Sequence, residues 1–260
     1  MNRTPTTLNR MEVPDFVHPF LEGAGVYDSS CSPMAKVWFL DKDRGYYLKS
    51  AAKGSLQKET ELARFFHKKG LGAEVIAYES DERDWLLTVR VPGEDCVFPR
   101  YLDDPKRLCD TTAELLRMLH ETDCSGCPIP DRTADYLETA VRGHATGYFD
   151  DKIFSEEWTY IPEDAWRLVE EGGKHLKADT LLHGDYCLPN IMLDNWKFSG
   201  FIDLDAGGVG DRNVDLFWGA WSLKYNLKTD AYRKRFLDAY GRDAVNEDLF
   251  PVIAAIEAFG

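Results

Sequence analysis

Three short polar side chains stand at the margins of two apolar runs in the stretch HGDYCLPNIMLDNWKFSGFID, residues 183–203. Asp185 and Asn190 come before the first run, and Asp203 follows the second. An amide oxygen beside a carboxylate suits Mg²⁺, which takes few protein ligands and completes its shell with phosphates. A second carboxylate nearby could orient a hydroxyl group and accept its proton. These residue types predict metal-assisted phosphoryl transfer from a nucleotide to an alcohol.

Such side chains meet only if the chain between them turns back on itself. Residues 191–193 and 198–202 have the composition of two short strands separated by a polar turn. A hairpin returns the chain to its starting point, so Asn190 and Asp203 become neighbours. Asp185 then reaches the same place from the loop that enters the hairpin.

The spacing matches that of protein kinases. In these enzymes H-R-D-x-x-x-x-N supplies the proton acceptor and one metal ligand, and a downstream Asp supplies another ligand. Here the first part reads His183-Gly184-Asp185-x-x-x-x-Asn190. Other phosphate-binding signatures are not completed, because Gly172–His175 lacks the Walker spacing and Gly23–Gly25 does not continue as GxGxxG.

The first hundred residues have the pattern of a small antiparallel sheet with one helix. A polar turn separates strands predicted at 36–40 and 46–49. Apolar spacing predicts a helix over 55–69, and two further strands follow at 73–78 and 85–91.

Lys49 and Glu59 complete the kinase pattern. Lys49 ends a strand, where a kinase places the lysine that contacts the α- and β-phosphates, and Glu59 lies ten residues on, in the predicted helix. Taken singly, Lys49 would be interpreted as an exposed lysine at the end of a strand, and Glu59 as an acid on the solvated face of a helix. Their order with the later motif favours a functional pair.

After residue 93 the pattern becomes helical. Helices are predicted at 103–121, 133–142, 162–177, 213–227, 229–240 and 246–258. The fold class predicted is therefore α+β, a protein-kinase-like two-lobed fold. The N-lobe, residues 1–93, would be a nucleotide-binding sheet with one helix, and the C-lobe, residues 94–260, would carry the catalytic loop and the substrate site.

Charge limits the possible partners. The chain has 260 residues with 45 acidic and 31 basic side chains, a formal net charge of −14. Such a surface repels phosphate backbones, which disfavours nucleic acid, and attracts polycationic small molecules. The same charge is also that of an ordinary acidic surface.

The sequence predicts a cytoplasmic protein without a membrane segment. Its apolar runs fall short of the roughly 20 residues that span a bilayer, and the N-terminal stretch lacks the apolar core of a signal peptide. Six scattered cysteines suit reduced thiols. Cys124 and Cys127 alone are patterned. A surface turn is the favoured interpretation, since a structural zinc needs four ligands and His120 is the only other candidate nearby, and a zinc or thiol–disulfide role is the alternative.

The chain resembles the aminoglycoside phosphotransferases, in particular the 3′-phosphotransferase type. The likeness covers nearly the whole length. It rests on CSPMAKV at 31–37, YYLK at 46–49, LH at 119–120, HGDYCLPNI at 183–191 and SGFID at 199–203. The family has the two-lobed fold of the protein kinases.

The resemblance implies a nucleotide site that uses ATP or GTP. Ser32 and its neighbours would form the loop over the phosphates, and Tyr47 would stack on the base. Backbone groups near Val89 and Val91 would bind the edge of the base, and Lys49 would contact the phosphates.

The resemblance also implies the chemistry. Glu59 would orient the lysine, and Asp185 would orient the hydroxyl of the substrate. Asn190 and Asp203 would hold Mg²⁺, while His183 and Asp215 would brace the catalytic loop.

On the acceptor side, carboxylates would bind protonated amines. Candidates are Asp150, Asp151, Glu156 and Glu157 in one polar segment, which could equally be a solvated loop, and Glu257 near the C-terminus. The chain also departs from the family pattern. Asp205 and Ala206 replace a Gly-Arg pair after the metal Asp, and Tyr225 and Asn226 stand where acids are expected.

We therefore expect a kinase that phosphorylates a hydroxyl of an aminoglycoside antibiotic and confers resistance, as a monomer or weak dimer. A same-fold kinase for another small alcohol, such as a macrolide, choline or a sugar amine, is the alternative. A nucleotide-binding module without catalysis is disfavoured, because all three catalytic positions are filled.

Overall fold

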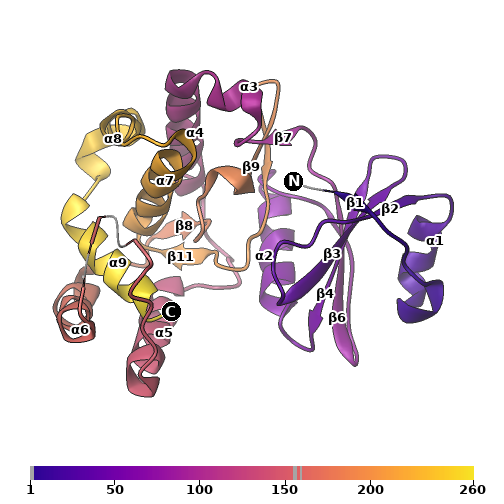
Figure 1. The fold of residues 1–260 in the computed structure, drawn as a ribbon, viewed down its shortest axis with the longest axis horizontal. Coiled ribbons are helices and arrows are strands. Elements are labelled where there is room, and N and C mark those ends of the chain that lie inside the picture. The colour runs from indigo at the N-terminus through magenta and orange to yellow at the C-terminus, as the bar shows by residue number, and fades with distance from the viewer. Residues whose placement is uncertain (1–2, 155–156, 159) are drawn as a thin grey trace. The chain divides into compact units, whose positions relative to one another are not determined.

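The computed structural model describes residues 3–154, 157–158 and 160–260. The chain forms two compact units, residues 1–96 with 189–206, and residues 97–188 with 207–260. The first is rich in strands and the second in helices (Figure 1), which confirms the predicted α+β two-lobed class. The sequence predicts one boundary at residue 93, whereas the structure groups the 191–201 hairpin with the first unit, because its strand pairs with residues 94–95.

The first unit is built on an antiparallel sheet of strand order β1-β2-β3-β4-β6-β5. The strands are β1 (Thr4–Pro5), β2 (Gly25–Asp28), β3 (Ala35–Asp41), β4 (Tyr46–Ala52), β5 (Val75–Ser80) and β6 (Arg83–Val89). The four predicted strands are β3 to β6. Two helices belong to this unit, α1 (His18–Leu21) and α2 (Gln57–Lys68).

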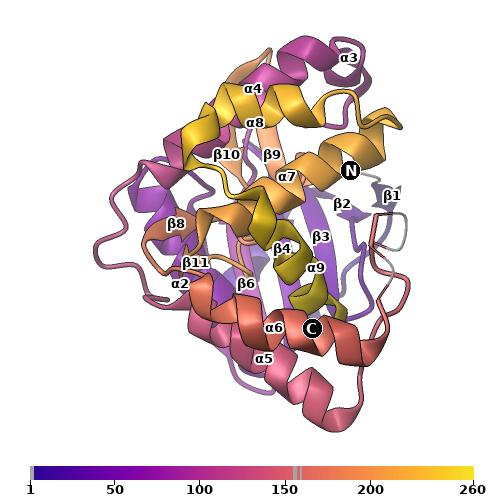
Figure 2. The same cartoon turned by 90° about the vertical axis from the view of Figure 1, so that its left-hand side faces the viewer.

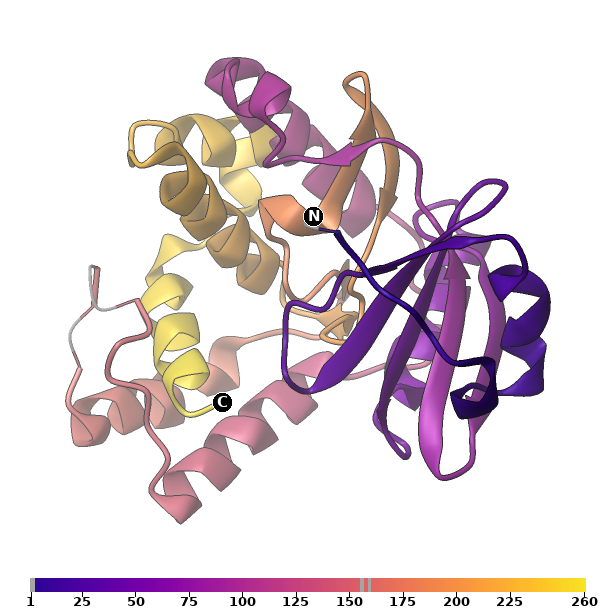
Figure 3. The same cartoon turned by 45° about the vertical axis from the view of Figure 1, so that its right-hand side comes forward.

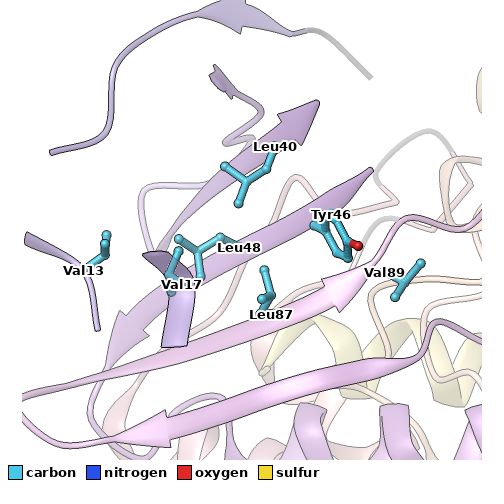
Figure 4. Packing of buried hydrophobic residues seen from close by; sticks show 7 residues of the cluster. All are labelled: Val13, Val17, Leu40, Tyr46, Leu48, Leu87 and Val89. Atoms are coloured by element: carbon cyan, nitrogen blue, oxygen red, sulfur yellow. The ribbon is translucent and has the colours of Figure 1, made fainter. Parts of the chain in front are cut away.

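The two faces of the sheet carry different side chains. One face buries an apolar cluster shown in Figure 4, made of Val13, Val17, Leu40, Tyr46, Leu48, Leu87 and Val89. Successive side chains of a strand point to opposite faces. Tyr47 and Lys49 therefore project from the face of β4 that is opposite to the cluster.

Asp84 ties the β4–α2 connection to the sheet. This carboxylate is fully buried. One of its oxygens accepts the N–H of Gly54 at 2.8 Å, and the other accepts the N–H of Leu56 at 2.8 Å and the hydroxyl of Tyr78 at 3.0 Å. Burial alone would raise the pKa of Asp84, but hydrogen bonds from Ser80 and from these groups lower it overall.

We expect Asp84→Asn to destabilise the protein by about 2–4 kcal/mol at neutral pH, because backbone donors lose a charged acceptor. A lowered pKa in the folded state means that this contribution is present above the ordinary pKa near 3.8 and is lost as the pH falls further. Urea unfolding at several pH values measures it. Glu82→Gln, an exposed acid in the same turn, is the control. Equal unfolding midpoints for Asp84→Asn and the parent at neutral pH would contradict this account.

A small three-stranded sheet completes the first unit, with the order β10-β9-β7. Its strands are β7 (Glu94–Asp95), β9 (Ile191–Asp194) and β10 (Lys197–Phe201). Asn195 and Trp196 form the tight turn with φ angles of 48° and 69°, as a type I′ hairpin requires. Gly93 allows the backbone before β7 to approach the backbone of β9 closely, since a Cβ there would lie 2.1 Å from the carbonyl oxygen of Leu193. The predicted hairpin is confirmed.

The second unit consists of seven α-helices in its described part, together with a two-stranded sheet. The helices are α3 (Pro99–Leu102), α4 (Pro105–His120), α5 (Arg132–Thr146), α6 (Pro162–Gly172), α7 (Arg212–Leu227), α8 (Arg233–Gly241) and α9 (Phe250–Ala258). The sheet pairs β8 (Thr180–Leu182) with β11 (Gly208–Gly210). The apolar helix α9 lies against α5, α6 and α7 (Figure 2).

The C-terminus lies in close contact with α5. A Cβ on Gly143 would come 1.8 Å from the carbonyl oxygen of Phe259, so only glycine permits this approach. The contact fixes the end of α9 and, with it, Glu257. Within the described ranges, no helix combines the length and the apolar character needed to cross a bilayer.

Candidate active site

Lys49 is the centre of a charged cluster in the first unit. It lies on β4 between Val37 of β3 and Leu86 of β6. Its Nζ is 2.7 Å from Oε2 of Glu59 on α2 and 3.3 Å from Oδ1 of Asp203, just beyond β10. Folding thus brings together three of the predicted site residues, which are up to 154 positions apart in sequence.

The cluster carries an excess of negative charge. Burial opposes the charged form of Lys49, but Glu59 and Asp203 outweigh it and raise the lysine's pKa, so the ammonium stays protonated. Burial raises the pKa of Glu59, and the charges of Asp203 and Asp205 add to the effect. One ammonium therefore faces three carboxylates, an arrangement that favours an additional cation.

Asn190 and Asp203 lie at the two ends of the β9–β10 hairpin. The N–H of Ile202 donates to the carbonyl of Asn190 at 3.1 Å, which closes the hairpin directly before Asp203. Asp203 has a φ of 60°, a strained conformation for this residue type, and its side chain is 50% exposed. The Asn190 amide and the Asp203 carboxylate are hard oxygen donors, so the pair fits Mg²⁺.

Asp185 belongs to the second unit, in the loop after β8. Asp215 fixes this loop, because its carboxylate accepts the N–H groups of His183 and Gly184, each at 2.8 Å. Nε2 of His120 lies 3.2 Å from Oδ2 of Asp215, the same oxygen that accepts the N–H of His183. The N–H of Asp185 in turn donates to Nδ1 of His183 at 3.3 Å. The backbone beneath Asp185 is thus held by buried polar groups.

Cys187 is a neighbour of Asp185 within the HGDYCLPNI motif, and the sequence alone assigns it no chemical role. Its N–H donates to the carbonyl of Asp185 at 2.8 Å. Burial raises the pKa of the Cys187 thiol, and its hydrogen bond to the Asp185 side chain raises it further. The sulfur therefore stays protonated and acts as a donor to this carboxylate.

The residues predicted around the nucleotide all lie in the first unit. Ser32 is exposed in the β2–β3 loop, where its Oγ accepts the N–H of Met34 at 3.2 Å. Val89 is buried in the apolar cluster, and its N–H already donates to Glu74 at 2.9 Å. Binding of a base by that N–H would break a sheet hydrogen bond. The binding of the base by backbone groups near Val89 and Val91 stays a prediction.

Glu257 on α9, one of the carboxylates predicted to bind the acceptor, is fixed by two side-chain hydrogen bonds. Its Oε1 accepts the hydroxyl of Tyr136 at 2.7 Å and Nε1 of Trp218 at 3.0 Å. Burial raises the pKa of Glu257, and the charge of Asp185 contributes in the same direction. Tyr136 and Trp218 could not be predicted as partners of Glu257, since nothing in their spacing links them to residue 257.

The other four carboxylates predicted to bind the acceptor belong to one segment before α6, and the three described ones have different surroundings. The N–H of Asp150 donates to the carbonyl of Ala258 at 2.8 Å, which brings its segment to the end of α9. Asp151 is exposed. Glu157 is neutralised by Lys224 and Arg233, both at 2.9 Å. Glu156 lies outside the described residues.

Comparison with known proteins identifies the family. Residues 34–252 match the phosphotransferase enzyme family, and the chain belongs to it. A probable aminoglycoside 3′-phosphotransferase of Lactococcus lactis subsp. lactis (strain IL1403) is 47% identical over 254 residues, which is 97% of each chain. The chain is therefore a phosphotransferase, and its resemblance to the aminoglycoside enzymes is confirmed.

Solved structures agree with this fold. An aminoglycoside 3′-phosphotransferase of type VIII is 27% identical, with a TM-score of 0.75 over 96% of both chains. An aminoglycoside phosphotransferase of Streptomyces rimosus ATCC10970, in complex with ADP and streptomycin, superimposes with a TM-score of 0.74. That protein is 20% identical and covers 94% of this chain and 96% of its own, so it supports the fold alone.

Proposed function

We propose that this phosphotransferase moves the γ-phosphoryl group of ATP or GTP to a hydroxyl of an aminoglycoside antibiotic and so confers resistance. The observation that carries the proposal is the contact of Lys49 with Glu59 and Asp203. The arrangement is similar to that of the protein kinases, in which a lysine–glutamate pair and a metal-binding aspartate must both be in place. The aminoglycoside names of the similar proteins supply the acceptor class.

The chemistry assigned to the chain is positioning and charge compensation. Lys49, held by Glu59, would contact the phosphates of the donor, and Tyr47 would stack on its base. Asp185 would orient the attacking hydroxyl and accept its proton. A Mg²⁺ ion held by Asn190 and Asp203 would neutralise charge on the phosphates.

The acidic residues favour a cationic acceptor. The net charge of −14 attracts an oligoamine. The charge of the proposed catalytic Asp185 contributes to the raised pKa of Glu257. Asp150 and Asp151 lie on the segment bonded to the end of α9. These three carboxylates, with Glu156 and Glu157, remain our candidates for binding protonated amines. We place the reaction in the cytoplasm, in keeping with six free cysteines, and expect a monomer or weak dimer.

A panel of kanamycin, neomycin and streptomycin, coupled to nucleotide turnover, tests the proposal. We expect rapid turnover with at least one of them and dependence on Mg²⁺. A lack of turnover with every aminoglycoside would contradict it.

One observation favours the second candidate, a kinase for another small alcohol. Helix α7 carries Tyr225 at one of the two positions where the family pattern has acids, and this side chain is 56% exposed. Its ring stacks on Trp221 with centroids 5.0 Å apart, and Nζ of Lys228 lies 4.2 Å from the ring centroid. Aromatic faces suit a less highly charged acceptor, or one with a single quaternary amine. Adding a macrolide, choline and a sugar amine to the panel separates the two candidates.

Glu257→Gln should raise the KM for the aminoglycoside about ten- to hundredfold, because a charge-assisted contact to an amine is lost. The KM for the nucleotide should not change. Steady-state kinetics with each substrate varied in turn provide the measurement. Glu163→Gln, which alters an exposed acid on α6, should behave like the parent. An unchanged acceptor KM in Glu257→Gln would exclude Glu257 from the acceptor site.

A further inference from the structure

The N-terminal segment extends the main sheet of the first unit by one strand. β1 pairs with β2 through Thr4 opposite Asp28 and Pro5 opposite Tyr27. The N–H of Thr6 continues the pairing to the carbonyl of Val26 at 3.0 Å. Figure 3 shows this indigo segment running along the sheet. The strand is short, and Arg3 directly precedes it at the edge of the sheet.

Arg3 contacts two aromatic rings of neighbouring strands. Its guanidinium carbon is 3.5 Å from the ring centroid of Phe39, and Nη2 donates to the hydroxyl of Tyr47 at 2.9 Å. Phe39 and Tyr47 are register partners across β3 and β4, with centroids 5.2 Å apart. Phe39 is only 2% exposed and forms a fixed base for the stack. A planar guanidinium can stack on one ring and donate to the other at once.

The stack lies on the sheet face that carries the charged cluster. Tyr47 and Lys49 are two residues apart on β4, so both side chains project from the same face. Tyr46 and Leu48 point to the opposite face, into the apolar cluster. The ring that Arg3 holds is therefore beside the lysine to which we assign the phosphates.

We propose that Arg3 is a positioning residue of the nucleotide site, which holds the Tyr47 ring ready to stack on the base. The inference rests on the proposed function, which makes Tyr47 the base-stacking residue. A side chain already fixed before binding loses less conformational freedom when the ligand arrives. Arg3 thus strengthens nucleotide binding through Tyr47 and takes no part in the chemical step.

The test is a double-mutant cycle on the full chain. Arg3→Gln removes the stacked donor, and Tyr47→Phe removes the acceptor while keeping the ring. We expect each change to weaken ATP or ADP binding about three- to tenfold in calorimetric titrations. The double variant should bind no more weakly than the weaker single variant, since both changes break the same contact. The donor KM should rise with them, while kcat and the acceptor KM stay constant.

Arg10→Gln is the matched control, because it removes the same charge from the same N-terminal segment at an exposed residue. Thermal unfolding of all variants checks that the sheet is intact. Binding by Arg3→Gln equal to that of the parent would overturn the inference. The inference would also be overturned if the losses of nucleotide affinity in the two single variants multiplied in the double variant, because Arg3 would then act independently of the Tyr47 hydroxyl.

Tyr47→Ala separates this inference from the proposed function. If Tyr47→Ala loses nucleotide affinity while Arg3→Gln does not, the base-stacking role stands and the role of Arg3 fails. If the parent protein binds no nucleotide at all, the proposed function fails and the role of Arg3 fails with it.

Discussion

Asp185→Asn should lower kcat by about 10²–10⁴-fold, because the amide cannot accept the proton of the attacking hydroxyl. The substitution keeps the shape of the side chain, and the backbone bonds of this loop to Asp215 involve His183 and Gly184 instead. Nucleotide affinity should therefore be nearly unchanged. Single-turnover kinetics combined with nucleotide titration measure both quantities.

Asp194→Asn provides the control for this prediction, since it alters an exposed acid at the end of β9. It should leave kcat close to that of the parent. Ordinary turnover by Asp185→Asn would show that another group accepts the proton. A loss of nucleotide binding equal to the loss of turnover would instead give Asp185 a structural role.

Asp203→Asn should reduce kcat/KM at least about 100-fold, because it removes both a carboxylate ligand for Mg²⁺ and a partner of Lys49. The Mg²⁺ concentration for half-maximal rate should rise, a shift that loss of proton transfer alone would not produce. Titration of the rate with Mg²⁺ at saturating nucleotide gives this number.

Asp81→Asn is the matched control, because it alters an exposed acid in the β5–β6 turn of the same unit, outside the charged cluster. It should leave the Mg²⁺ dependence close to that of the parent. Equal Mg²⁺ dependence of Asp203→Asn and the parent would remove Asp203 from the metal site.

Local patterns predict the elements with strong periodicity. The helices α2 and α4 begin and end within two residues of their predicted limits, because each has a continuous apolar stripe. The predicted start at 229 is wrong by four residues, as α8 begins at Arg233. The strands β1, β8 and β11 are two or three residues long and form only through their partners, so no local pattern indicates them.

The site was predictable where the residue order itself carries information. Lys49, Glu59 and Asp203 keep the order of a kinase, and the structure brings them into contact. Partners that depend only on tertiary packing were not predictable. Tyr136 meets Glu257 across 121 residues, and Arg3 meets Tyr47 through an edge strand. Each involves a common residue type without a motif, so only the folded chain reveals the pair.

The central claim is that this chain transfers a phosphoryl group to an aminoglycoside. The most direct measurement is mass spectrometry of kanamycin after incubation with the protein, ATP and Mg²⁺, with ADP quantified in the same sample. We expect an antibiotic that carries one added phosphate, in an amount equal to the ADP formed, and product formation at least about 100-fold slower with Asp185→Asn. Formation of ADP while kanamycin and the other aminoglycosides stay unmodified would contradict it.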